Sequence, residues 1–144
     1  KLRKSCILYK QNNAQKGSKT LNMKIPKDFE IVPVDGDFEI KPGVVDEKSG
    51  KYSFDSFIKA IDLAKEKKVD AITTLPIHKE AWNKAGIKYK GHTEVLRDIF
   101  KKDAIMMLGC ESMYVALFTE HIPLKNVAEK VKKENLVKFF IDFY

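Results

Sequence analysis

The stretch "SFDSFIKAIDLAKEKKVDAITTLP", Ser53 to Pro76, carries the pattern that decides the fold. Its large apolar residues recur at the spacing of one helical face: Phe54, Phe57, Ile58 and Ile61. Ser53 is the expected N-cap, and the lysines after residue 64 suit the negative end of a helix. The following segment, 69–76, predicts a strand that the proline ends.

The alternation of helix and strand continues downstream of this stretch, from about residue 53 onward. Upstream, the apolar run 5–10 is expected to be a strand or a buried helix end. Short strands are expected at 30–34 and 38–40, with an irregular connection over 41–51. Downstream, the pattern predicts a helix over 78–86 with Gly86 as its C-cap and a helix over 93–100 capped by Thr93. Buried strands are expected at 103–109 and 112–119, followed by one or two helices over 124–144. Alternating helices and strands favour an α/β fold over a bundle or a sandwich.

The last predicted helix, "LVKFFIDFY", has an apolar face that no later segment of the sequence covers. Phe139, Phe140 and Phe143 lie on or beside this face. We expect them to pack against further polypeptide or against another subunit, because such a face is stable only when it is buried.

Composition describes a globular chain rather than a disordered one. Of 144 residues, 44% are hydrophobic and 33% are charged, and the net charge is +7. All but two of the 27 basic residues are lysines, the exceptions being Arg3 and Arg97. Bidentate contacts to bases and phosphates favour arginine. The charge therefore indicates a solvated lysine-rich surface, or a phosphorylated small substrate, rather than a nucleic-acid partner.

Two further features bear on the compartment. No apolar run reaches the roughly 18 residues that a membrane span needs, so no membrane partner is expected. Cys6 and Cys110 lack any CxxC spacing, which favours a reduced, cytoplasmic protein, although the sequence leaves a disulfide between them open.

Three histidines are the main candidates for chemistry: His78, His92 and His121. His78 and His121 follow predicted strands, and ligands of open α/β sheets bind at the carboxyl ends of the strands. Imidazole is a common zinc ligand, but no two of these histidines have the spacing of a local metal motif. Each can equally be a hydrogen-bonded structural residue.

The tetrapeptide "GHTE", Gly91 to Glu94, has two local interpretations. The glycine allows a close approach of the backbone, and free N–H groups at a helix start favour an anion such as phosphate. His92 and Thr93 add a ring donor and a hydroxyl at the same place. The alternative is a plain helix start with a neighbouring histidine.

Two longer stretches resemble one enzyme family. "DAITTLPIHKEAWNKAGIKYKGHTEVL" and "IMMLGCESMYVALFTEHIPLKNV", with the upstream "IKPGVVDEKSGKYSFDSFIKAIDLA", resemble 4-hydroxythreonine-4-phosphate dehydrogenase. The resemblance implies a three-layer α/β/α fold like that of isocitrate and isopropylmalate dehydrogenases, and a homodimer with its active site at the interface. It implies NAD-dependent oxidation of 4-phosphooxy-L-threonine to a β-keto acid, which decarboxylates to 3-amino-2-oxopropyl phosphate in pyridoxal phosphate biosynthesis. A divalent metal is also implied, zinc ahead of magnesium or cobalt.

The resemblance also assigns roles to single residues. His92 and Thr93 correspond to substrate-binding residues, and His121 corresponds to a metal ligand. His78 falls where asparagine is also common and is left out of the site. Three positions depart from the family pattern: Lys90, Tyr114 and Glu120. Of these, Glu120 bears on the site, because it changes the charge beside the metal histidine.

The family's first strand, its other metal histidines and most of its NAD contacts have no counterpart in these residues. The expectation is therefore that residues 1–144 are the central part of a longer dehydrogenase domain, inactive alone. The NAD-binding and catalytic residues are unassigned. Two other hypotheses stay open: a basic anion-binding interaction module without catalysis, and a metal hydrolase built from all three histidines.

Overall fold

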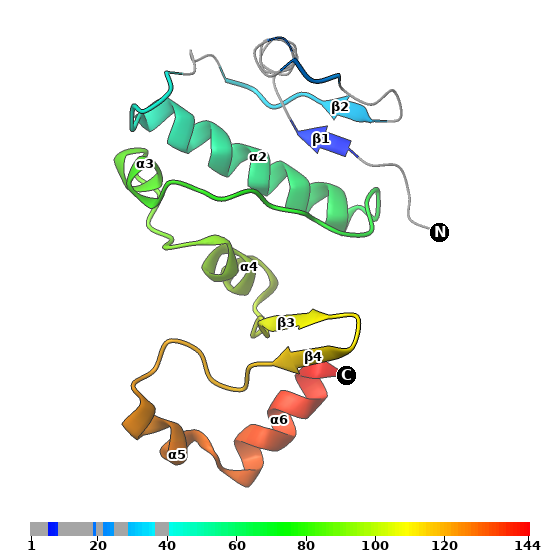
Figure 1. The fold of residues 1–144 in the computed structure, drawn as a ribbon, viewed down its shortest axis with the longest axis vertical. Helices are drawn as coiled ribbons and strands as arrows, with labels where there is room; N and C mark the ends of the chain where they lie inside the picture. Colours follow the sequence, from blue (N-terminus) through cyan, green and yellow to red (C-terminus); the bar gives the residue numbers. More distant parts are fainter. Residues whose placement is uncertain (1–5, 9–18, 20–21, 25–28, 37–40) are drawn as a thin grey trace. The chain divides into compact units, whose positions relative to one another are not determined.

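The computed structural model describes residues 6–8, 19, 22–24, 29–36 and 41–144. The chain divides into two compact units, Lys1–Gly91 and His92–Tyr144, here called the N-terminal and C-terminal units (Figure 1). Among the residues given a structure, no helix is both long enough and apolar enough to cross a membrane.

The N-terminal unit pairs two short strands beside a long helix (Figure 1). Strand β1, Cys6–Leu8, runs parallel to β2, Glu30–Val32, with Ile7 opposite Ile31. The second strand was predicted, and Pro33 directly follows it. For the first, the strand formed rather than the alternative of a buried helix end. The strand expected at 38–40 lies outside the described residues.

Helix α2, Glu47–Lys65, begins six residues earlier than its predicted N-cap. Asp46 is the cap, because its carboxylate accepts a hydrogen bond from the Ser49 N–H at 3.0 Å. The prediction that Ser53 caps the helix was therefore wrong, and so was the prediction that the residues after 46 form an irregular connection. Asp46 lies in a stretch with two glycines, Gly43 and Gly50, and glycine is unfavourable inside a helix, so the pattern did not predict a helix start there. The apolar face was predicted correctly, since Phe57 and Ile61 are buried.

Helix α3, Lys79–Lys84, is closed at both ends by backbone and side-chain hydrogen bonds. At its start His78 is the N-cap, and its Nδ1 accepts from the Ala81 N–H at 3.3 Å. At its end Gly86, with φ +74°, donates to the Asn83 carbonyl at 2.9 Å, and Ile87 donates to that of Trp82 at 2.9 Å. This is a Schellman motif, so Gly86 does end the helix, one residue beyond the cap position.

The core of the N-terminal unit lies where α3 crosses α2. Trp82 is fully buried, and its indole N–H donates to the Ser53 hydroxyl at 2.7 Å. Phe54 meets the same indole edge to face, with ring centroids 5.3 Å apart. Gly50 lets the two helices touch, because a Cβ there would lie 2.1 Å from the Ala81 carbonyl oxygen.

The strand predicted over 69–76 does not form in the structure. Leu75 is 81% exposed, although the prediction placed this segment in a sheet. An apolar run becomes a strand only when a neighbouring strand completes its hydrogen bonds, and no strand of the described residues pairs with it.

The C-terminal unit combines one hairpin with helices on both sides in sequence. Its elements are α4 (His92–Phe100), β3 (Met107–Cys110), β4 (Met113–Ala116), the 3-10 helix η1 (Leu124–Asn126), α5 (Val127–Lys130) and α6 (Lys133–Phe143). The hairpin is antiparallel, with Leu108 opposite Val115. One or two helices were predicted over 124–144, and two α-helices, α5 and α6, form there.

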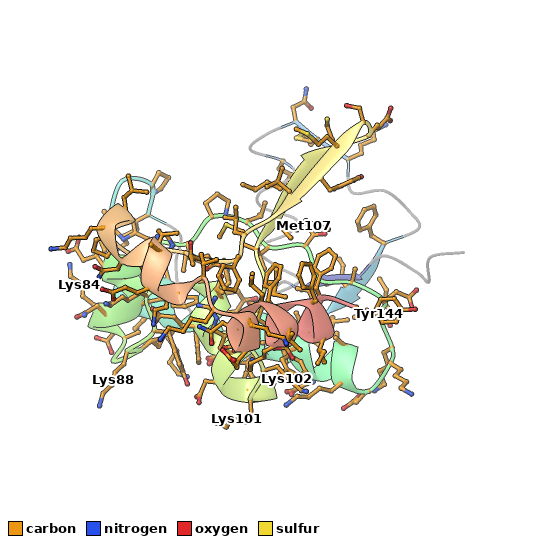
Figure 2. The ribbon with its side chains drawn as sticks, turned by 90° about the horizontal axis from the view of Figure 1, so that it is seen from below. Lys84, Lys88, Lys101, Lys102, Met107 and Tyr144 are labelled. Atoms are coloured by element: carbon orange, nitrogen blue, oxygen red, sulfur yellow. The ribbon has the colours of Figure 1, made fainter. Side chains whose placement is uncertain are left out.

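The hairpin strands were predicted to be buried, and that part of the prediction was wrong. Met107 and Tyr114 are 53% and 64% exposed, and the side chains of the hairpin project from the ribbon, Met107 among them (Figure 2). A two-stranded ribbon has two faces and two edges, and neighbouring strands or helices are needed to bury them.

The aromatic face of α6 is only partly covered. Phe139 meets Phe118, which follows β4, edge to face at 5.4 Å and stacks on Phe143 at 6.2 Å. Phe140 and Phe143 remain 64% and 51% exposed. The expectation that this face needs further cover remains a prediction.

Candidate functional site

The residues of "GHTE" lie at the start of α4. His92 is the first helical residue and Thr93 the second, so the prediction that Thr93 caps the helix was wrong. Both side chains are half-buried. They therefore sit in the first turn, where backbone N–H groups have no partner within the helix.

Burial sets the protonation state of His92. Partial loss of water around the ring lowers the pKa of the His92 imidazole below its usual 6.5. The neutral form of the ring therefore predominates at pH 7, and in that form one ring nitrogen is a donor and the other an acceptor. A neutral donor of this kind suits a hydroxyl or phosphate oxygen.

His121 lies in an exposed turn between β4 and η1. Its φ is +50°, in the left-handed region that few residues other than glycine occupy. Such a conformation costs roughly 1–3 kcal/mol, and neighbouring contacts must hold it.

A hollow of about 520 Å³ opens beside this turn, within the C-terminal unit. His121 and Glu120 line it, and so do Glu94 and Arg97 of α4. His92 and Thr93 are not among its lining residues. The structure therefore brings His121 to the side of α4, but it does not bring the three predicted site residues into one hollow.

Arg97 and Glu120 connect these two parts of the unit. An Nη of Arg97 donates to Glu120 Oε2 at 3.2 Å and to the Ala104 carbonyl at 3.0 Å. Glu120 Oε1 accepts from the Met106 N–H at 3.2 Å. The Glu120 side chain is 11% exposed, so both carboxylate oxygens are satisfied within the protein. The negative charge beside His121 is thus paired with a guanidinium.

A second set of charges also lines the hollow. Lys138 of α6 contacts Asp103 at 2.7 Å and Asp142 at 2.6 Å. These carboxylates raise the pKa of the Lys138 ammonium, which in turn lowers the pKa of Asp103. The groups are exposed, and exposed pairs of this kind contribute little to stability.

The described residues do not form a complete metal site. Within the described part of the chain, no group of three or more histidine, cysteine, aspartate or glutamate side chains is placed to hold a metal ion. His121 offers a donor of the type zinc takes, while His78 spends its Nδ1 on the helix cap. The residues present fit one ligand of a metal site rather than a whole site, and the three-histidine hydrolase gains no support.

Sequence reasoning did not place Arg97 at the site. Its composition signal was present, because Arg97 is one of two arginines among 27 basic residues. Arginine is the residue suited to a planar, partly buried ion pair.

The sequence left open a disulfide between Cys6 and Cys110. In the structure the thiol of Cys110 is free and exposed.

Comparisons with known proteins agree on one family. The family model "Pyridoxal phosphate biosynthetic protein PdxA" matches residues 2–143. The chain is 62% identical over 126 residues to a 4-hydroxythreonine-4-phosphate dehydrogenase of Sulfurimonas denitrificans, covering 88% of this chain and 41% of that protein. It is 52% identical over 124 residues to one of Campylobacter fetus, covering 86% and 40%. The chain thus spans about two fifths of the length of these relatives.

Solved structures give the same architecture. A 4-hydroxythreonine-4-phosphate dehydrogenase from Burkholderia phymatum superposes with a TM-score of 0.85 at 21% identity, covering 96% of this chain and 47% of that one. One from Klebsiella pneumoniae gives 0.66 at 25% identity, covering 94% and 40%. These likenesses confirm the predicted α/β class. With the family model matching nearly every residue, the chain belongs to the PdxA family of pyridoxal phosphate biosynthetic proteins.

Proposed function

We propose that the protein acts as a 4-hydroxythreonine-4-phosphate dehydrogenase. The observation that carries this proposal is 62% identity to a relative of that name across the segment that holds "GHTE" and "TEHIPL". In the reaction, the secondary alcohol of 4-phosphooxy-L-threonine loses a hydride to NAD and a proton to solvent. The β-keto acid so formed loses carbon dioxide and leaves 3-amino-2-oxopropyl phosphate.

In this proposal the start of α4 binds the substrate. His92 and Thr93 lie in the first turn of α4, where the positive end of the helix dipole favours a negatively charged group. The lowered pKa of His92 keeps its ring neutral, so that it orients a substrate oxygen by hydrogen bonding. Thr93 adds a hydroxyl from the same turn.

His121 is proposed as one ligand of a divalent metal, with zinc the best match to an imidazole donor. The metal, when bound, polarises the reacting oxygen of the substrate. The exposed position of His121 leaves its ring accessible to ligands from elsewhere. Those further ligands, and the residues that bind NAD, are not assigned to this chain.

The proposal extends to assembly and location. We propose a homodimer whose active site lies at the interface, acting in the cytoplasm without a nucleic-acid or membrane partner. The exposed apolar side chains of the hairpin and of α6 support such an interface, and the free thiol of Cys110 supports a reducing compartment. We further propose that residues 1–144 are a central part of the dehydrogenase domain. The chain by itself is then expected to give no NADH from substrate, NAD and zinc, and sustained turnover would contradict this.

The metal assignment is tested by replacing His121 with alanine in the complete protein. The expected result is loss of bound zinc, measured by elemental analysis after dialysis against a weak chelator. His78→Asn is the matched control, because asparagine also caps helices and the variant removes an imidazole without touching the proposed site. Zinc content equal to that of the wild type in His121→Ala would refute the assignment.

A further inference from the structure

We propose that Arg97 and Glu120 form a positioning pair that sets the direction in which His121 is presented. The inference rests on the proposed function, because it concerns how the proposed ligand is held. Neither side chain needs to touch the metal or the substrate. Their part is to fix the turn that carries His121 against helix α4.

The geometry gives this pair three anchors. Arg97 comes from the middle of α4 and donates from one nitrogen to Glu120 and to the Ala104 carbonyl, at 3.2 and 3.0 Å. Glu120 Oε1 in turn accepts a hydrogen bond from the Met106 N–H at 3.2 Å. The hairpin ladder continues from there, since the Leu117 N–H donates to the Met106 carbonyl at 2.9 Å. Helix, hairpin entry and hairpin exit are thereby joined at one carboxylate.

His121 is the next residue in the chain, and its backbone is the strained point. With φ at +50°, the turn is held away from the conformations that histidine prefers. Strain persists where surrounding contacts determine the backbone, and the side chain of Glu120 supplies such contacts one residue earlier. Release of Glu120 would let the turn relax and would change the direction of the imidazole.

The pair also explains an arginine on a surface otherwise built with lysines. Arg97 is the only arginine in residues 92–144. A lysine ammonium lacks the planar fork that holds a carboxylate in one orientation. Glu120 at 11% exposure also needs a fixed partner, because an unpaired carboxylate there would be costly. The distances and burial thus favour a structural lock over a chance surface contact.

The test measures zinc affinity of the complete protein, by competition with a chelating dye, for Arg97→Ala, Glu120→Ala and the double variant. Loss of a partner that orients a ligand typically weakens metal binding about 10–100-fold, so each single variant should lose at least tenfold. Because the two residues act as one unit, the double variant should bind no more weakly than the weaker single variant. The KM for phosphorylated substrate should stay unchanged while kcat falls, since His92 and Thr93 are not part of the network.

Lys101→Ala is the matched control. It removes the exposed Lys101–Asp98 ion pair, 2.7 Å long, which joins α4 only to the residue that follows it. Its zinc affinity should equal that of the wild type. Glu120→Gln keeps the size of the side chain and one acceptor oxygen, and should bind zinc with an affinity between those of the wild type and Glu120→Ala. It also serves where an alanine variant does not fold.

The outcomes separate this inference from the proposed function. Wild-type zinc affinity in folded Arg97 and Glu120 variants, or additive losses in the double variant, would overturn the positioning role. If His121→Ala alone loses zinc, the pair has no such role and the metal assignment stands. If His121→Ala retains zinc, both proposals fall.

Discussion

The contact between α2 and α3 makes Gly50→Ala the most informative single change to the fold. A Cβ at residue 50 would lie 2.1 Å from the Ala81 carbonyl oxygen, 2.4 Å from its carbon and 3.0 Å from the Trp82 nitrogen. These atoms are backbone, so no side chain can rotate out of the way. Ordinary contact begins near 3.4 Å, so the start of α3 must move by about 1.3 Å.

The size of the effect follows from what that movement disturbs. Trp82 is fully buried between the helices, and a gap of 0.5–1 Å already forfeits a quarter to a half of a dispersion contact. Overpacking of this kind costs about 1–3 kcal/mol. Alanine recovers roughly 0.5–1 kcal/mol, because it is a better helix former than glycine. The difference is a net loss of about 0–2.5 kcal/mol in the free energy of unfolding, and we expect a value near the middle of that range, about 1 kcal/mol.

Urea denaturation followed by the fluorescence of Trp82 measures this loss. Trp82 is the only tryptophan in the 144 residues, so its emission also reports whether water has reached the indole. Gly91→Ala is the control, because a Cβ there meets nothing within 4 Å. A Gly50→Ala variant as stable as the wild type, with unshifted emission, would show that α2 and α3 do not touch at this point.

Two further predictions concern Ser53 and His92. Ser53→Ala removes the hydroxyl that accepts a hydrogen bond from the buried indole N–H of Trp82 at 2.7 Å, and it should cost about 1–3 kcal/mol in urea unfolding. Ser56→Ala removes a bond to the Tyr52 carbonyl of its own helix and should cost less. Folding lowers the pKa of His92, so the unfolded chain binds a proton at this ring more readily than the folded protein does. The free energy of unfolding is therefore unaffected by His92 above pH 6.5 and decreases as the pH falls from there through the folded pKa. The urea midpoint should therefore drop between pH 7.5 and 5.5, and drop less in His92→Gln; equal drops would contradict the burial of the ring.

Helices were predicted well because their signals are local. The face that buries Phe57 and Ile61 could be identified from spacing alone, and Gly86 marked the end of α3. The start of α2 was missed because Asp46 and Ser53 both suit an N-cap, and only the hydrogen bond to Ser49 distinguishes them. Element type was thus predictable, while the boundary depended on which of two competing caps formed.

Strands were predicted less well because a strand needs a hydrogen-bonding partner and cover that its own residues do not specify. The segment 69–76 has the composition of a buried strand, yet it pairs with no strand of the described residues. Strands β3 and β4 overlap the predicted segments 103–109 and 112–119 but are only four residues long each, and Leu108 and Tyr114 are exposed. A strand pattern states that a surface is fit for burial, and tertiary neighbours decide whether it is buried.

The candidate site shows the same division between local and distant information. Resemblance placed His92, Thr93 and His121, but no spacing rule indicates that Arg97 reaches Glu120, 23 positions away. The sequence did mark Glu120 as a departure from the family pattern that changes the charge beside the proposed metal ligand. In the structure this carboxylate forms an ion pair with Arg97, the single arginine of the C-terminal unit. A departure at one position is therefore best interpreted together with its contact partner, because Arg97 makes Glu120 a support for His121 rather than a competing charge.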